Sequence, residues 1–239
     1  VEECLALASL LEEASSFPSK LEEMFLLQKQ LNDSTNGKNW ELGLNKFNKE
    51  INWLRCIHME VAELIDSTPW KHWKNINSSP DMNNIHVELV DIWHFLMSYI
   101  LQETNVPKAV SLVNTHCIYE AAQNIDVNLI IKESEKLSYI ALAIETKNMP
   151  SFSGIERFIE QFFRACKSAG LSFSWLQKLY IGKNCLNQFR QDNGYKEGTY
   201  KKVWNGSEDN VVMVELLKTI EDVSFDELYE QLKLKYNQN

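Results

Sequence analysis

Apolar side chains recur along this chain at intervals of three and four residues, the spacing that places them on one face of an α-helix. Glycine and proline, which interrupt helices, number only 8 and 5 among 239 residues. The pattern therefore predicts an all-α fold. The expected helical segments are 2–14, 19–32, 45–66, 84–103, 107–119, 121–147, 155–166 and 174–183, followed by a helical tail that begins at a capping box, Ser224 to Glu227.

Two of these segments carry a pair of acidic residues that are three positions apart. Glu60 and Glu63 belong to the segment 45–66, and Glu88 and Asp91 belong to the segment 84–103. At this spacing both carboxylates of a pair lie on the same face of a helix. Taken alone, the first pair fits a solvated helix face as well as it fits a buried site.

The second pair, Glu88 and Asp91, is surrounded by apolar residues on every side. These neighbours are Ile85, Val87, Leu89, Val90, Ile92, Trp93, Phe95, Leu96 and Met97. A helix that is apolar all round is normally buried, and a buried carboxylate is costly unless a counter-charge is present. We therefore expect both acidic pairs to converge on one or more divalent cations. Oxygen ligands without a zinc-like cysteine or histidine set favour Mg²⁺ or Mn²⁺.

The net charge and the cysteines limit the partners and the compartment. A formal charge of −9 argues against a general nucleic-acid binder, which would carry a basic face. The five cysteines are scattered and odd in number, so we expect reduced thiols in a cytoplasmic protein. Early glutamates argue against a signal peptide, and Glu88, Asp91 and His94 interrupt the longest apolar run. We expect neither a nucleic acid nor a membrane as a partner.

A cationic, glycine-rich segment spans residues 182–206. It contains four of the eight glycines, together with Lys183, Arg190, Lys196, Lys201 and Lys202. Such a segment can close over an anionic ligand, although a solvated loop can have the same composition. Together with the acidic pairs it predicts a polyphosphate site, where metal ions activate water and basic side chains neutralise the leaving group.

Two further features allow a structural or a ligand-binding role. The amides of Gln28 and Asn32 are one helical turn apart and can cap the helix or contact a ligand. We favour the structural role for these amides when they are considered alone. The connection 68–74 contains two tryptophans, one of them Trp73, which can seal the edge of a core or contact a ring-shaped ligand.

Several of these motifs together resemble those of the dimeric, all-α dUTPases. They are Gln28-x-x-x-Asn32, Glu60-x-x-Glu63, Glu88-x-x-Asp91, Gly182-Lys183-Asn184 through Arg190-Gln191-Asp192-Asn193-Gly194-Tyr195-Lys196, and Trp204-Asn205-Gly206-x-Glu208-Asp209-Asn210. The resemblance covers about residues 25–102 and 175–212. It implies a helical bundle of the all-α nucleotide pyrophosphatase type, with a glycine- and lysine-rich loop near its C-terminal part. We expect one domain over residues 1–239, with residues 103–150 as a candidate helical insertion.

The resemblance also implies an activity, a cofactor and a set of site residues. The activity is Mg²⁺-dependent hydrolysis of dUTP, and of dUDP, to dUMP by attack of a metal-activated water, in a homodimer. Glu60, Glu63, Glu88 and Asp91 would hold the metal, and Glu60 would be the base for the water. The residues implied around uracil and deoxyribose are Gln28, Asn32, Trp73, His94, Phe95 and Asn187, and those implied at the phosphates are Lys183, Arg190 and Lys202.

Three other functions remain open at the level of sequence. A nucleoside triphosphate pyrophosphatase of broader specificity would use the same acidic core. A nucleotide-binding protein without turnover would use the same site. A di-iron protein would need Glu-x-x-His motifs on two helices, whereas this chain offers only Asp91-x-x-His94 in the acidic segments.

Overall fold

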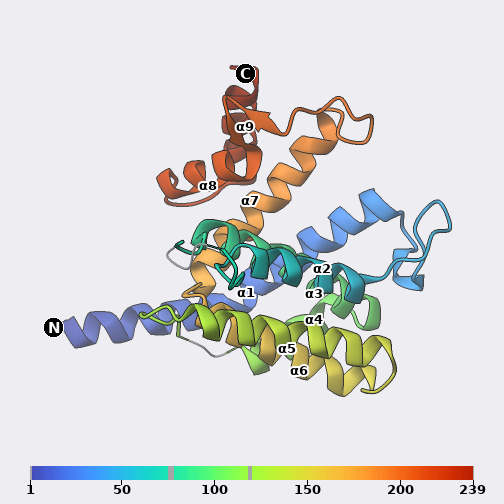
Figure 1. The fold of residues 1–239 in the computed structure, drawn as a ribbon, viewed down its shortest axis with the longest axis vertical. Coiled ribbons are helices and arrows are strands. Elements are labelled where there is room, and N and C mark those ends of the chain that lie inside the picture. Colours follow the sequence, from blue (N-terminus) through green and yellow to red (C-terminus); the bar gives the residue numbers. More distant parts are fainter. Residues whose placement is uncertain (1, 75–77, 118–119, 239) are drawn as a thin grey trace.

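The computed structural model describes residues 2–74, 78–117 and 120–238, with the side chains of 2–16 and 151–152 left aside. Within these residues the chain is almost entirely helical, which confirms the expected all-α fold (Figure 1). The elements are α1 (Glu2–Asn36), η1 (Trp40–Leu42), α2 (Trp53–Asp66), α3 (Met82–Glu103), α4 (Val106–His116), α5 (Val127–Glu145), α6 (Ser151–Ser168), α7 (Phe173–Asp192), β1 (Val203–Trp204), β2 (Ser207–Glu208), α8 (Asp209–Thr219) and α9 (Phe225–Asn237).

Helix α3 is the centre of the bundle. It contacts α1, α2, α4, α6, α7 and α8, while α5 packs between α2 and α6. Helix α7 leads from this core to the C-terminal helices α8 and α9, which lie at the opposite end of the view from α5 and α6 (Figure 1). None of the helices in the described part of the chain combines the length and the apolarity needed to cross a membrane.

The burial of α3 follows from its composition. Its side chains are buried around the whole circumference, as expected for a helix without a polar face. Asp81 caps its start by accepting a hydrogen bond from the Asn84 backbone N–H at 3.0 Å. Trp93 is fully buried and stacks on Phe162 of α6, with 5.0 Å between the ring centroids. The packing of α3 therefore fixes the positions of Glu88 and Asp91.

Helix α2 begins eight residues later than the sequence predicts. Its N-cap is Asn52, whose side chain accepts from the Arg55 backbone N–H at 2.8 Å. The preceding residues form turns because the Asn45 side chain accepts hydrogen bonds from the backbone of Phe47 and Lys49. Gly43 supplies a left-handed backbone conformation, with φ of 82°, at the end of η1.

The predicted break near residues 15–18 is wrong, because α1 continues through Pro18 to Asn36. A proline inside a helix costs about 3 kcal/mol through a lost hydrogen bond and a steric clash. Leu21, Met24 and Phe25 are fully buried in the next turns. Each such side chain contributes roughly 1.5–3 kcal/mol, so the packing of one continuous helix outweighs the cost of the proline.

Helix α7 also differs from the prediction, because it extends through Gly182 to Asp192 rather than ending at residue 183. A Cβ atom on Gly182 would lie 2.6 Å from Leu217 Cδ1, so this glycine allows α8 to approach α7. As a result Lys183 and Arg190 are helical residues, two turns apart, and the glycine- and lysine-rich loop begins only at Asn193.

The remaining boundaries differ by smaller amounts. Helix α5 begins at Val127 rather than at residue 121, because the Asp126 side chain caps the Asn128 and Leu129 N–H groups. Helix α4 ends at His116, and residues 118–119 of the predicted segment lie outside the described residues. Helix α9 begins after Ser224, but the Ser224 side chain makes no capping hydrogen bond, so the predicted capping box is not formed.

Candidate active site

Three carboxylates meet where α2 packs against α3. One oxygen each of Glu60, Glu88 and Asp91 lies within 4.8 Å of the others. Glu88 is only 7% exposed, and Glu60 and Asp91 are half-buried. Glu63, one turn after Glu60, is exposed and stands outside this group. We call Glu60, Glu88 and Asp91 the acidic cluster.

Burial and mutual repulsion shift the proton affinities of the acidic cluster. Burial raises the pKa of Glu60 well above its ordinary value, and repulsion from Asp91 and Glu88 adds to the effect. Burial also raises the pKa of Glu88, with Asp91 acting in the same direction and Lys183 opposing it. A divalent cation would remove this repulsion, and the oxygen-only donor set fits Mg²⁺ or Mn²⁺.

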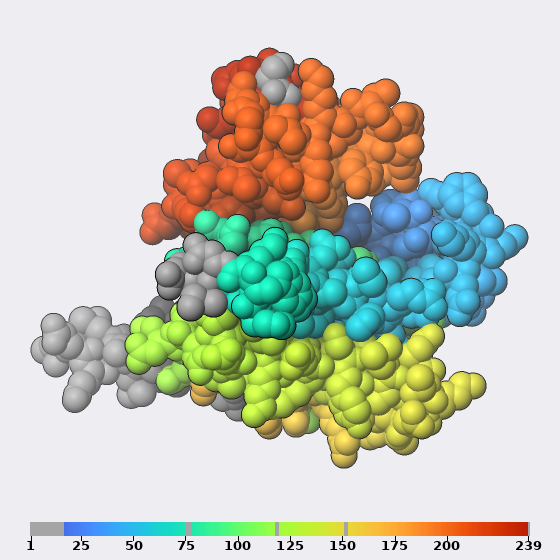
Figure 2. All heavy atoms as spheres, in the orientation of Figure 1, coloured from blue at the N-terminus to red at the C-terminus, as the bar shows by residue number. Residues whose placement is uncertain are grey.

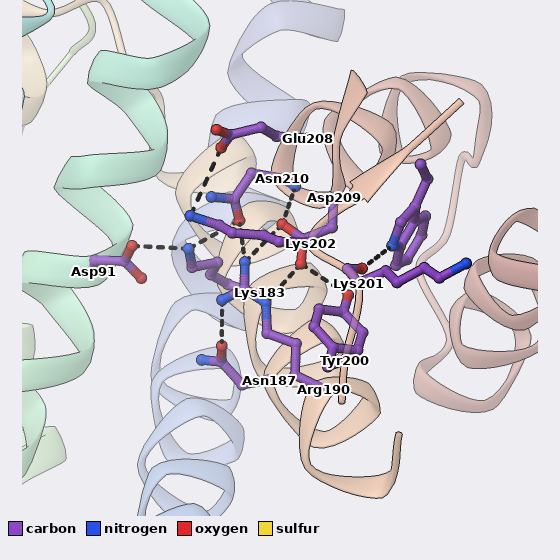
Figure 3. A network of polar contacts seen from close by, with 11 residues as sticks. Asp91, Lys183, Asn187, Arg190, Tyr200, Lys201, Lys202, Glu208, Asp209 and Asn210 are labelled. Carbon is purple, nitrogen blue, oxygen red and sulfur yellow. Dashed lines mark hydrogen bonds and ion pairs between the residues drawn. The ribbon is translucent and has the colours of Figure 1, made fainter. Parts of the chain in front are cut away.

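Lys183 of α7 faces the acidic cluster. Its Nζ lies 2.8 Å from Asp91 Oδ2 and donates to Asn210 Oδ1 at 3.0 Å (Figure 3). The Lys183 side chain is only 5% exposed. A buried ammonium requires such partners, and Asp91 and Asn210 supply them from two other helices.

Arg190, two turns after Lys183, is bound by Asp209 at the start of α8. The Arg190 Nε and Nη2 atoms donate to the two oxygens of Asp209, each at 2.8 Å (Figure 3). Tyr200 also donates to Asp209, whose side chain is fully buried. Arg190 Nη1 donates to Asn187 Oδ1 at 3.3 Å. This network joins α7 to the segment 200–210.

Lys202 lies in the same segment but is more exposed. Its Nζ is 3.7 Å from Glu208 Oε2, and both side chains are more than half exposed. Of the three predicted phosphate-binding residues, Lys183 and Arg190 are therefore buried in one network, whereas Lys202 is a surface cation beside that network (Figure 3).

A cavity of about 300 Å³ adjoins the acidic cluster between α1, α3 and α7. Figure 2 shows the surface hollowed between the blue end of α1 and the orange segment that follows α7. The lining residues are Gln28, Leu31, Asn32, Thr35, Asn36, Trp53, Asp91, His94, Phe95, Asn187 and Gln191. They include five of the six residues that the sequence places around the base and sugar. Asp91 belongs to both the cavity and the acidic cluster, so a bound molecule can contact both.

The amide of Gln28 is fully occupied by other protein groups. Its Oε1 lies 2.7 Å from His94 Nδ1 and 3.1 Å from the Tyr180 hydroxyl. Its Nε2 donates to Ser98 Oγ at 3.0 Å and to Asn32 Oδ1 at 3.3 Å. An amide has two donor hydrogens and two acceptor lone pairs, so Gln28 has none to spare. The family resemblance implies Gln28 as a contact of the base or sugar, whereas here its amide holds His94 and Asn32, which is a structural role.

Three lining residues carry a buried polar atom that has no partner. Among the described residues five such side-chain atoms occur, and three of them are Trp53 Nε1, His94 Nε2 and Gln191 Oε1. Buried polar groups are normally hydrogen-bonded, and orphaned ones that gather around one cavity indicate a ligand site. Burial lowers the pKa of His94 to about 4, so its imidazole is neutral at neutral pH.

Trp73 does not line this cavity. It is 62% exposed in the segment after α2, and its ring lies edge-on to Trp70 with centroids 5.5 Å apart. His72 lies against the same ring at 4.9 Å. The Trp70 indole is tied to the end of α2 through a hydrogen bond to Asp66.

Comparison with known proteins agrees with this geometry. The profile of the family described as dUTPase matches residues 20–195. The chain belongs to the all-α dUTPase family. Membership makes it a hydrolase that acts on dUTP, in a family that is generally metal-dependent. A search of curated proteins found no match. The range matched to the dUTPase family contains the acidic cluster and the whole cavity lining, and ends before the segment 200–210.

Sequence reasoning missed several residues of this dUTPase site, among them Trp53, Gln191 and Asp209. Trp53 lines the cavity and stacks on Phe95 with 6.0 Å between centroids. It precedes Glu60 by two helical turns, so a shared helix face was the available signal. Gln191 and Asp209 lie inside the motifs that carry the family resemblance, but nothing local distinguishes the fully buried Asp209 from the exposed Glu208 beside it.

Proposed function

We propose that the protein hydrolyses dUTP and dUDP to dUMP in a Mg²⁺-dependent reaction. The observation that carries this proposal is the convergence of Glu60, Glu88 and Asp91 beside the cavity. Glu63 would complete the metal-binding set, since it lies one turn from Glu60 on the same helix. Mg²⁺ or Mn²⁺ held by these residues would lower the pKa of the attacking water and offset the negative charge of the phosphates.

In this proposal Glu60 accepts the proton of the attacking water. A general base works best when its pKa lies near the working pH, and burial raises the pKa of Glu60 in that direction. Lys183, Arg190 and Lys202 bind the phosphates. The position of Lys183 supports this role, because phosphate oxygens that reach the acidic cluster come within range of its ammonium.

The orphaned atoms of the cavity support recognition of uracil and deoxyribose. His94 Nε2 and Gln191 Oε1 are acceptors, and Trp53 Nε1 is a donor. Uracil offers an N–H flanked by two carbonyl groups, and deoxyribose offers a hydroxyl. Cytosine has a lone pair in place of that N–H, so an acceptor placed there would repel it.

Other lining residues complete the proposed contacts to the nucleoside. Phe95 and Trp53 supply stacked rings for the base, while Asn32 and Asn187 each keep a free N–H. Side chains packed against ring carbon 5 of uracil would exclude the methyl group of thymine. Side chains packed against the 2′ position of the sugar would exclude the hydroxyl group of ribose. Trp73 stays a predicted contact of the base. Closure of the glycine- and lysine-rich loop over the substrate would exclude water from the metal.

The test is release of pyrophosphate and dUMP from dUTP with and without Mg²⁺, beside dCTP, dTTP and UTP. We expect Mg²⁺-dependent turnover of deoxyuridine nucleotides alone, reduced roughly 10²- to 10⁴-fold by Glu60→Gln. Glu135→Gln, an exposed carboxylate of α5, is the matched control and should retain full activity. Turnover of several bases would indicate a broader pyrophosphatase. Absence of turnover would indicate a binding protein.

We further propose that the enzyme is a cytoplasmic homodimer. Leu42 and Phe47 are 80% and 79% exposed on the segment between α1 and α2, and a partner subunit would cover such apolar surface. Four cysteines of the described residues, Cys56, Cys117, Cys166 and Cys185, are free thiols, as suits a reducing compartment. Light scattering at micromolar concentration should give twice the 27.8 kDa chain mass, and a value of one chain mass would contradict the dimer.

A further inference from the structure

The ammonium of Lys183 lies beside the acidic cluster and acts as an internal counter-ion to it. It lies 2.8 Å from Asp91 Oδ2, and Asp91 is the cluster residue that also lines the cavity. The charge of Lys183 also reaches Glu88, because it opposes the rise in the pKa of that carboxyl group. One internal cation therefore offsets part of the repulsion among three carboxylates.

This ion pair puts Lys183 in competition with a metal ion. A metal that binds Asp91 must draw its carboxylate away from Lys183 or share it. If the carboxylate is drawn away, the ammonium is left with Asn210, in a position where its side chain is only 5% exposed. If the carboxylate is shared, the metal ion and the ammonium repel each other across it. A buried charge that loses its partner is strongly destabilising. A free metal ion therefore has to overcome this cost.

A polyphosphate removes the cost, because its oxygens can replace Asp91 as partners of Lys183. Asn210 Oδ1 accepts from both Lys183 Nζ at 3.0 Å and Arg190 Nη2 at 3.3 Å, which keeps the two cations side by side (Figure 3). An ammonium has three donor hydrogens, so Lys183 can turn to a phosphate while it still holds Asn210.

We propose that Lys183, by pairing with Asp91, makes the site select the metal–nucleotide complex over the free metal ion. The proposal rests on the proposed function, since it assigns the form in which the substrate of that site binds. Metal and polyphosphate then bind with positive coupling. The metal becomes the new partner of Asp91 and the polyphosphate becomes the new partner of Lys183, so neither residue is left unpaired when both ligands bind.

The test is Mn²⁺ binding to the full chain without nucleotide, followed by the electron paramagnetic resonance signal of free Mn²⁺. Lys183→Met removes the competing cation and should bind Mn²⁺ about tenfold more tightly than the unmodified protein. Lys201→Met makes the same change of charge at an exposed residue of the neighbouring loop. It should alter the affinity less than about twofold, because solvent screens its charge. Unchanged or weaker binding by Lys183→Met would overturn the proposal.

A second measurement adds a dUTP analogue with a non-cleavable imido bridge between the α- and β-phosphates. The analogue should strengthen Mn²⁺ binding about tenfold more in the unmodified protein than in Lys183→Met. Equal strengthening in both would contradict the coupling. Lys183→Gln repeats both measurements if circular dichroism shows that the methionine variant is unfolded. Absence of dUTP turnover together with the expected Mn²⁺ affinities would contradict the proposed hydrolysis but not the competition between Lys183 and the metal. Normal turnover with an unchanged Mn²⁺ affinity in Lys183→Met would contradict this inference and leave the proposed function standing.

Discussion

His94 Nδ1 lies 2.7 Å from Gln28 Oε1, and this contact fixes the tautomer of the imidazole. A carboxamide oxygen only accepts hydrogen bonds, so the Nδ1 atom carries the proton and Nε2 is left as an acceptor. Nε2 is also one of the orphaned buried atoms of the cavity lining. Gln28 on α1 thus decides what kind of group His94 on α3 can bind.

Removal of the Gln28 amide should weaken substrate binding and the fold together. In Gln28→Ala, His94 loses the partner of Nδ1, and the buried Ser98 hydroxyl loses one donor. We expect the KM for dUTP to rise about tenfold and the free energy of unfolding to fall by about 1–3 kcal/mol. Steady-state kinetics and urea unfolding measure these quantities. Gln30→Ala, on an exposed position of the same helix, should change neither.

The lowered pKa of His94 predicts that this residue contributes less stability in acid than at neutral pH. The folded protein holds His94 neutral down to about pH 4, whereas an unfolded histidine takes up a proton near pH 6.5. The stability that this residue contributes is present above pH 6.5 and is lost as pH falls through 4, by about 3 kcal/mol at that point. Urea unfolding at pH 7 and pH 4 tests this. His94→Gln should show a smaller difference, and an equal difference would exclude His94 as the cause.

The raised pKa values of Glu60 and Glu88 predict proton release when a metal binds. Burial keeps a proton on the acidic cluster near neutral pH, and a cation must displace it. Mg²⁺ affinity should therefore rise with pH, with about one proton released at pH 7. Calorimetry in buffers of different ionisation enthalpy measures this number. Heats that are independent of the buffer would contradict it.

The raised pKa values of Glu60 and Glu88 also make the stability of the metal-free protein depend on pH. This dependence is opposite in direction to the one that His94 causes. A carboxyl group whose pKa is raised by folding stabilises the folded protein below its unfolded pKa, and this stability is lost as pH rises through the folded value. Metal-free protein should become less stable between pH 5 and pH 8. Saturating Mg²⁺ should reverse the trend, which thermal unfolding at both pH values would show.

Asp209 should matter far more to stability than its neighbour Glu208. Asp209→Asn leaves the Arg190 guanidinium without its buried counter-charge, and such a break costs about 3–5 kcal/mol. Glu208→Gln removes only an exposed pair with Lys202, which contributes less than about 1 kcal/mol. Urea unfolding of the two variants compares adjacent residues of the same charge. Equal losses would show that the Arg190 pair is not what anchors this segment.

The central part of the site could be predicted because its signal is local. Glu88 and Asp91 stand in a run of residues without a polar face, and burial of that run is enough to require a counter-charge. The all-α fold followed from the low content of glycine and proline together with the helical spacing of apolar residues. The assignment of the metal, base and phosphate residues stays a prediction, as does the insertion at residues 103–150.

Features that depend on distant contacts could not be predicted. From the sequence, Gly182 is predicted to begin the cationic, glycine-rich segment. Its position inside a longer helix depends on close packing against Leu217, which lies 35 positions later in the chain. Trp53 gains its place in the cavity lining from Phe95, which belongs to another helix. The occupied amide of Gln28 likewise depends on His94, Ser98 and Tyr180. Sequence spacing shows which residues share a face, but not which atoms already have partners.

The continuous helix between Lys183 and Arg190 sets a limit on how the length of the chain can vary. An α-helix turns by about 100° per residue, so one residue inserted between them would rotate Arg190 away from Asp209 while Lys183 stayed at Asp91. The loop that begins at Asn193 has no such constraint, because its glycines at 194 and 198 adopt positive φ in turns. Natural changes of length in this region should therefore fall after residue 192 and not before it.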